Sequence, residues 1–288
     1  LTTDHPVGGF FCFYTLYIYY EQIRTMNNLL LVMTLATATL PTTNCTQTNT
    51  ANENIIARNT DTSNNKSTAT DKYAQLREWQ AGSTVSLNTI KEYGVSKCFS
   101  QHNIDDNLFL RIKNKSYKNN CTVSRSDLRY LHLLHYTEDG KIKLGEMICH
   151  KDIANALIDI FRELFNNHYP IERMQLIDDF DADDIKSMEH NNTTCFNFRV
   201  VAGSKKLSNH SLGKAVDINP LYNPYVKRRS NGTYKISPET GKAYTDRTKK
   251  FKYKIDHNDL AYKLFTKHGF RWGGNYRSLK DYQHFEIN

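Results

Sequence analysis

Two short segments in the C-terminal third of the chain carry side chains that could bind a metal ion. The first, Leu207 to Asn219, reads LSNHSLGKAVDIN and holds His210 and Asp217 seven positions apart. The second reads DYQHFE and contributes Asp281 and His284. Two imidazoles and one carboxylate, with a fourth position left open, form the ligand set of a catalytic zinc site. The second carboxylate would then be available to move the proton of an attacking water molecule.

The elements around these segments must bring them together. Residues 214–218 read as a strand, so Asp217 alternates with its neighbours across two faces. His210 precedes this strand across a turn at Gly213, and the DYQHFE segment also reads as a strand. Residues 222–254 form a long excursion rich in Pro, Gly and Lys, and such loops are usually lids, binding loops or disordered segments.

The rest of the ordered chain alternates between helical and strand patterns. The clearest helix is 152–167, with one apolar face, and the Asp139-Gly140 pair predicts a hairpin turn. Other helices are expected at 71–80, 84–93 and 256–268, and strands at 108–112, 128–136, 141–149, 173–177 and 196–202. The pattern predicts a single α+β domain over residues 71–288, with a central antiparallel sheet flanked by helices and the zinc site on the sheet.

The N-terminal quarter predicts export rather than a fold. Residues 1–41 read as a leader, with an apolar run followed by a small-residue cleavage signal, and residues 1–25 precede Met26 and are interpreted as upstream sequence. Residues 42–70 are rich in Asn and Thr and predict a disordered linker. We expect a secreted, periplasmic or cell-envelope protein whose mature chain has no transmembrane segment. Cys45 is a candidate lipid-anchor cysteine, although Asn44 stands where a small residue is preferred.

The net charge of +8 in 288 residues is concentrated in one segment. Residues 225–254 contain ten Lys or Arg and two acidic residues. Such a basic loop could hold an anionic cell-wall polymer or could simply be a solvated surface. The basic residues do not follow the pattern of a nucleic-acid-binding module, so no nucleic-acid partner is expected.

The cysteines do not predict a metal site of their own. Beyond the leader and linker, the chain has Cys98, Cys121, Cys149 and Cys195, without any C-x-x-C spacing. Cys98 and Cys121 could pair in an oxidising compartment, and free buried thiols are the alternative.

The two histidine segments together resemble a known family. The pattern S-x-H-x-x-G-x-A-x-D, followed near the C-terminus by [D/E]-x-x-H, is similar to that of zinc metallopeptidases that cut D-alanine-containing cell-wall peptides. These include D-alanyl-D-alanine carboxypeptidases and dipeptidases and L-alanyl-D-glutamate endolysins. The motif residues here are Ser208, His210, Gly213, Ala215 and Asp217, then Asp281 and His284.

The resemblance implies a role for each of these polar residues. His210, Asp217 and His284 would bind Zn²⁺. Asp281 would act as general base and later as general acid. Arg199, on a predicted strand before the first motif, would pair with the developing oxyanion or with a substrate carboxylate, for which a planar guanidinium is suited.

The implied activity is hydrolysis of an amide bond in the peptide stem of peptidoglycan, as in a D-alanyl-D-alanine carboxypeptidase. Two alternatives remain open at this stage. Asp281, where the dipeptidases usually have Glu, is closer to the carboxypeptidase–endolysin pattern, so an endopeptidase of the L-alanyl-D-glutamate type is one alternative. A non-catalytic binding module with the same fold and a structural zinc is the other.

Overall fold

The computed structural model describes residues 71–201 and 204–288. The predicted leader (1–41) and linker (42–70) lie outside the described residues. Within the part that the structure describes, no helix combines the length and the apolar character needed to cross a membrane.

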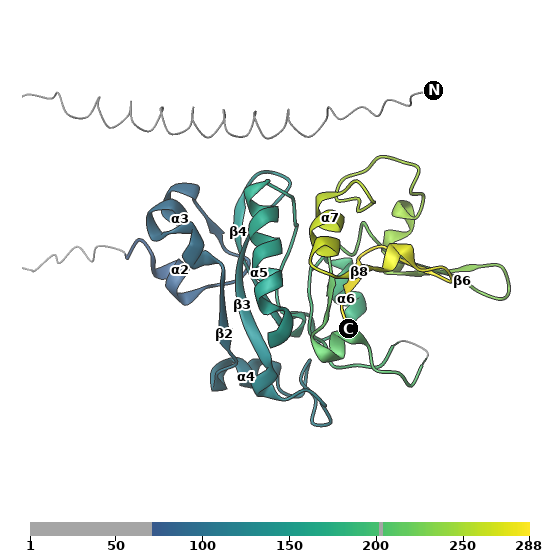
Figure 1. Ribbon diagram of the computed structural model, residues 1–288, viewed down its shortest axis with the longest axis horizontal. Coiled ribbons are helices and arrows are strands. Elements are labelled where there is room, and N and C mark those ends of the chain that lie inside the picture. Colours follow the sequence, from purple (N-terminus) through teal and green to yellow (C-terminus); the bar gives the residue numbers. More distant parts are fainter. Residues whose placement is uncertain (1–70, 202–203) are drawn as a thin grey trace, which may run out of the picture. The chain divides into compact units, whose positions relative to one another are not determined.

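A four-stranded antiparallel sheet forms the N-terminal half of the domain (Figure 1). The strand order is β1-β4-β3-β2, and the strands span Thr84–Val85 (β1), Ile142–His150 (β4), Leu128–Tyr136 (β3) and Ser100–Asn103 (β2). The long β3–β4 hairpin pairs Tyr136 with Ile142 beside its turn, and Gly140 there has φ +76°. The strand pairing confirms the predicted hairpin. Glycine suits this position in the turn because it adopts the left-handed conformation without strain.

Helix α5 (Lys151–Asn166) packs against β3 and β4 and closes the main core (Figure 1). Its predicted apolar face is confirmed, with Leu157, Phe161 and Leu164 almost completely buried. The helix begins directly after β4, where the ring of His150 accepts a hydrogen bond from the amide of Asp152. This contact supplies one of the caps that a helix start requires.

Two smaller sheets make up the C-terminal half. One has the order β5-β10-β8 and the other β7-β6-β9. Their strands span Ala215–Asp217 (β5), His284–Glu286 (β10), Arg271–Trp272 (β8), Tyr234–Ser237 (β7), Tyr225–Arg228 (β6) and Lys280–Asp281 (β9). The α+β class of a single domain is confirmed, but the expected central sheet is divided into three, and the residues of the zinc motif lie outside the largest one.

Short helices and 3₁₀ turns connect the sheets. The α-helices span Ala74–Glu78 (α2), Leu87–Tyr93 (α3), Asp106–Ile112 (α4), Asp184–Glu189 (α6) and Leu260–Lys267 (α7). The 3₁₀ turns span Val95–Cys98, Arg125–Asp127, Ile177–Phe180, Asn209–Leu212, Glu239–Tyr244 and Gly273–Asn275.

Three strand predictions were wrong. Residues 108–112 belong to α4, which begins after Asp105, whose side chain accepts a hydrogen bond from the amide of Leu108. Segments 173–177 and 196–202 form only isolated bridges in their described parts. In the first of these, the side chain of Asn192 bonds the amide and carbonyl of Gln175, where a neighbouring strand would otherwise do so. The backbone hydrogen-bonding groups of Gln175 thus have partners although the segment does not pair with a neighbouring strand.

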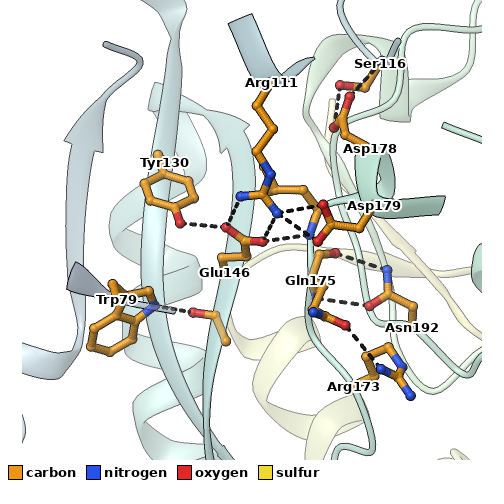
Figure 2. Close-up of polar contacts among 12 residues, drawn as sticks. Trp79, Arg111, Ser116, Tyr130, Glu146, Arg173, Gln175, Asp178, Asp179 and Asn192 are labelled. Carbon is orange, nitrogen blue, oxygen red and sulfur yellow. Dashed lines mark hydrogen bonds and ion pairs between the residues drawn. The ribbon is translucent and has the colours of Figure 1, made fainter. Parts of the chain in front are cut away.

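A buried ion-pair network links α4, the large sheet and the 3₁₀ turn 177–180 (Figure 2). The carboxylate of Glu146 is completely buried and accepts hydrogen bonds from Arg111 at 2.5 and 2.8 Å and from the Tyr130 hydroxyl at 2.6 Å. Arg111 also bonds Asp179 in the turn at 2.7 Å. The turn lies directly before α6, and Ile177 within it lines the main cavity described below. The network therefore fixes one wall of that cavity.

We expect Glu146→Gln to destabilise the domain by about 3 kcal/mol in urea unfolding, because it removes the completely buried carboxylate that pairs with Arg111. The matched control is Glu138→Gln, which removes a carboxylate from the half-exposed pair with Lys252. That change should have little effect, because solvent screens exposed ion pairs. Equal effects of the two substitutions would contradict the importance of the buried network.

Candidate metal centre

The first histidine is presented by a tight turn. Residues 209–212 form a 3₁₀ turn that begins after Ser208, whose hydroxyl accepts from the amide of His210 at 3.3 Å. The turn ends at Gly213, with φ +65°, and a Cβ added there would lie 2.7 Å from the backbone nitrogen of His150. Both the positive φ and this close approach require glycine. The chain then enters β5 directly.

The other two ligand candidates come from paired strands. In the antiparallel pairing of β5 with β10, His284 lies directly opposite Asp217. Directly opposite residues project from the same face of a sheet, with Cβ atoms roughly 5 Å apart. The pairing register alone therefore brings together two residues that are 67 positions apart in the sequence.

The three side chains converge on one small volume. His210 Nε2 lies 3.2 Å from His284 Nδ1 and 3.2 Å from Asp217 Oδ2, and His284 Nδ1 lies 3.1 Å from Asp217 Oδ1. Ligands about 2.0–2.1 Å from a tetrahedral zinc ion are separated from one another by roughly 3.3 Å. The observed separations are close to that edge length, and the side chains of all three residues are nearly completely buried.

Further hydrogen bonds orient both imidazoles. His210 Nδ1 donates to the carbonyl of Cys195 at 2.6 Å, and His284 Nε2 lies 3.3 Å from Glu286 Oε2. In the neutral tautomers with protons on His210 Nδ1 and His284 Nε2, the lone pairs of His210 Nε2 and His284 Nδ1 would be free to bind a metal ion beside Asp217. Metal-binding histidines usually have such a partner on the other ring nitrogen. The residues therefore fit a zinc ion.

Glu286 and its partners were missed by sequence reasoning. Its carboxylate also accepts from Asn209 at 2.5 Å, from the Tyr276 hydroxyl at 2.6 Å and from Arg271 at 3.0 Å. The sequence did offer one indication of a role for Glu286. It lies two residues after His284, and this spacing places both side chains on the same face of a strand. Glu286 holds the ring of His284 in place while other residues hold Glu286.

The electrostatics of the cluster favour a cation. Burial alone would raise the pKa of Asp217, but the two neighbouring imidazoles more than offset it and hold that pKa well below its usual range. Burial would lower the pKa of His284, yet hydrogen bonds to Asp217 and Glu286 raise it to about 10. The carboxylates thus stabilise positive charge at this position, and a bound divalent ion would supply it.

Asp281 lies in the same cavity but is separate from the three converging atoms. Burial raises the pKa of the Asp281 carboxyl to about 6, opposed by the charge of His284. The amide nitrogen of Gln283 donates to Asp281 Oδ1 at 3.3 Å. Gln283 is buried and was not among the predicted site residues, and its contact with Asp281 depends on the turn between β9 and β10.

Arg199 also lines this cavity, where its guanidinium forms an ion pair with Asp184 at the start of α6. The cavity has a volume of about 540 Å³, within the usual range for small-molecule sites. The apolar wall of the cavity is made of Ile177, Ile185, Met188, Val201, Leu207 and Leu279. The structure thus brings all five predicted site residues to one cavity.

Among the described residues, no cysteine contributes a thiol to the three converging side chains. The Cys195 thiol is completely buried and donates to the carbonyl of Gly213 at 3.4 Å, and burial holds its pKa well above the usual value. A neutral thiol of this kind is a poor nucleophile. Cys98 and Cys121 are free thiols in separate apolar clusters, so the possible pair between them is not formed.

Residues 202–287 match the family model described as D-alanyl-D-alanine carboxypeptidase, which belongs to the zinc metallopeptidases. The resemblance predicted from the two motifs is thus confirmed. The matched segment contains the three converging residues and Asp281, whereas Arg199 precedes it. At a coarse level the family supports a zinc-dependent metallopeptidase that acts on peptidoglycan-type substrates. No curated protein and no solved structure matches the chain.

We expect the purified full-length chain to bind one zinc ion, measured by elemental analysis, and expect His210→Ala and His284→Ala each to abolish stoichiometric binding. The control is His102→Ala on β2, which should bind zinc normally. Because a ligand that binds only the folded state stabilises it, chelation should lower the melting temperature of the wild-type protein. A folded wild-type chain that binds no zinc would contradict the assignment of this centre.

Proposed function

We propose that the chain is a zinc-dependent peptidase that hydrolyses an amide bond in the peptide stem of peptidoglycan, in the manner of a D-alanyl-D-alanine carboxypeptidase. The observation that carries the proposal is the arrangement of His210, Asp217 and His284 beside the separate carboxylate of Asp281 in one cavity. The family match over the same residues supports it.

A zinc ion held by the three ligand residues would polarise the peptide carbonyl as a Lewis acid and increase the acidity of water. Asp281 then takes the proton of the attacking water and hands it to the leaving amine. Its raised pKa, about 6 because of burial, suits both transfers near neutral pH. The hydrogen bond from Gln283 orients the carboxylate for this role.

Arg199 is proposed to pair with the developing oxyanion or with a substrate carboxylate. The ion pair with Asp184 holds its guanidinium at the cavity wall. A guanidinium held in this way binds a planar anion with less loss of conformational entropy than a free side chain. The same ion pair is also the competing explanation for its presence, because a purely structural arginine would make it too.

The endopeptidase alternative differs from this proposal in the bond that is cut. The test is incubation of the purified chain with intact peptidoglycan and with defined stem peptides, with zinc present or chelated, and mass analysis of the products. Loss of a terminal D-alanine indicates a carboxypeptidase, whereas separation between L-alanine and D-glutamate indicates an endopeptidase. Absence of any product from a zinc-loaded chain would favour the non-catalytic binding module.

The proposed substrate implies a place of action at the cell envelope. Secretion through the predicted leader and lipid attachment at Cys45 stay predictions, since both lie outside the described residues. The proposed role of the basic segment 225–254 in gripping an anionic wall polymer has no observation in its support. Part of that segment instead lines the cavity.

We expect Asp281→Asn to lower kcat by roughly 10²- to 10⁴-fold while zinc binding and melting temperature stay close to wild type, because the change removes the proton acceptor and preserves shape. The matched control is Asp159→Asn on the outer face of α5, which should keep full activity. If the chain is a non-catalytic module, the wild type has no turnover and neither substitution can change it. Full activity of Asp281→Asn would exclude Asp281 as the general base.

A further inference from the structure

The apolar wall of the cavity takes no part in the chemistry of the proposed reaction. Much of it comes from α6 and the 3₁₀ turn before it. Ile185 and Met188 stand three positions apart in α6, so they are neighbours on one side of the helix. Both line the cavity together with Ile177 from the turn, and Val201 and Leu207 line it from a separate segment. Aliphatic side chains from distant parts of the chain thus form one surface of the cavity.

Part of this wall is open to solvent. Ile185 is 46% exposed and Val201 is 42% exposed. A single exposed apolar side chain needs no explanation. Here, however, two of the six exposed large hydrophobic residues in the described part of the chain line one cavity, and Val200 beside them is a third. This clustering indicates a surface that an apolar group of a ligand would cover.

The wall begins beside the proposed base. The amide nitrogen of Gln283 lies 3.3 Å from Asp281 Oδ1 and 3.4 Å from the sulfur of Met188. Met188 is therefore only two hydrogen bonds away from the carboxylate that moves the proton. Since one extended residue spans about 3.5 Å, the side chain of a residue next to the scissile amide would reach this wall.

The charged group that α6 presents to the cavity is already engaged. The carboxylate of Asp184 pairs with Arg199 and accepts from the side-chain amide of Asn197 at 3.0 Å. A polar substrate side chain placed against Ile185 would lose hydrogen bonds to water and gain none from that residue. An aliphatic side chain would only remove apolar surface from water, which is favourable.

The wall is held in place by the buried network of the large sheet. Arg111 bonds Asp179 in the 3₁₀ turn that carries Ile177 and leads into α6 (Figure 2). At the start of α6, the side chain of Asp183 accepts from the amide of Lys186 at 3.0 Å and caps the helix. A surface fixed in this way discriminates between side chains by size, because it relaxes only partly around a smaller one.

We propose that the apolar wall is a subsite for an aliphatic side chain longer than the methyl group of alanine, carried by a residue that flanks the scissile amide. The inference rests on the proposed peptidase function and adds a side-chain specificity to it. The description of the matching family names two alanine residues. Their methyl groups would leave most of the wall uncovered, so the proposal gives the opposite order of preference.

The test compares peptides that differ in one side chain. Two series are built around the amide whose hydrolysis the mass analysis identifies, one varied on the carbonyl side of that amide and one on the amine side. The varied residue is alanine, norvaline or leucine, with its chirality unchanged. We expect kcat/KM of the zinc-loaded wild-type chain to be about tenfold or more higher for leucine than for alanine in one series, because added methylenes in an apolar pocket have effects of this size.

The ratio of the kcat/KM values for leucine and alanine isolates the subsite from general damage to the enzyme. Ile185→Asn should bring this ratio close to one, because a polar amide replaces aliphatic surface, and Ile185→Leu should preserve it. The matched control is Leu110→Asn on α4, where the side chain is 70% exposed and does not line the cavity. This control should leave the ratio at its wild-type value.

Three results would overturn the subsite while the peptidase function stands. The first is a wild-type chain that cleaves the alanine peptides at least as well as the leucine peptides in both series. The second is an equal loss of activity on alanine and leucine peptides with Ile185→Asn, as a purely structural role would give. The third is an equal change of the ratio with Leu110→Asn. If the zinc-loaded wild type cleaves neither these peptides nor intact peptidoglycan, the proposed function fails and the subsite fails with it.

Discussion

The antiparallel pairing of β5 with β10 is the constraint on which the candidate metal centre depends. It sets Asp217 opposite His284 on one face, and the 3₁₀ turn that precedes β5 brings His210 to the same point. A shift of one residue in this register would turn one of the paired side chains to the other face. Gly213 allows the turn to approach His150 closely enough for β5 to begin where it does.

The large sheet supports this centre from a distance. The buried carboxylate of Glu146 holds Arg111, and Arg111 holds Asp179 in the turn that leads into α6. That helix carries one half of the ion pair with Arg199 and part of the apolar wall of the cavity. Stability of the N-terminal half and shape of the site are therefore coupled through one polar network, in which each buried group has a partner.

The β6–β7 hairpin reaches the cavity through strand pairing. Tyr225 pairs with both Asp281 and Ser237, and all three residues line the cavity. Lys235 on the same hairpin also lines it. Part of the basic segment 225–254 therefore belongs to the wall of the cavity.

The sequence by itself determined the local features: α5 through its apolar face, the β3–β4 hairpin through its turn, and the residues of the candidate metal centre through their type and spacing. Tertiary structure decided the rest. Glu286, Gln283 and Lys235 reach the site only through strand registers and turns that join distant segments, and no periodicity records such pairings. The strand expected at 108–112 became part of α4, because a cap at Asp105 and the contact of Arg111 with Glu146 outweigh local propensity.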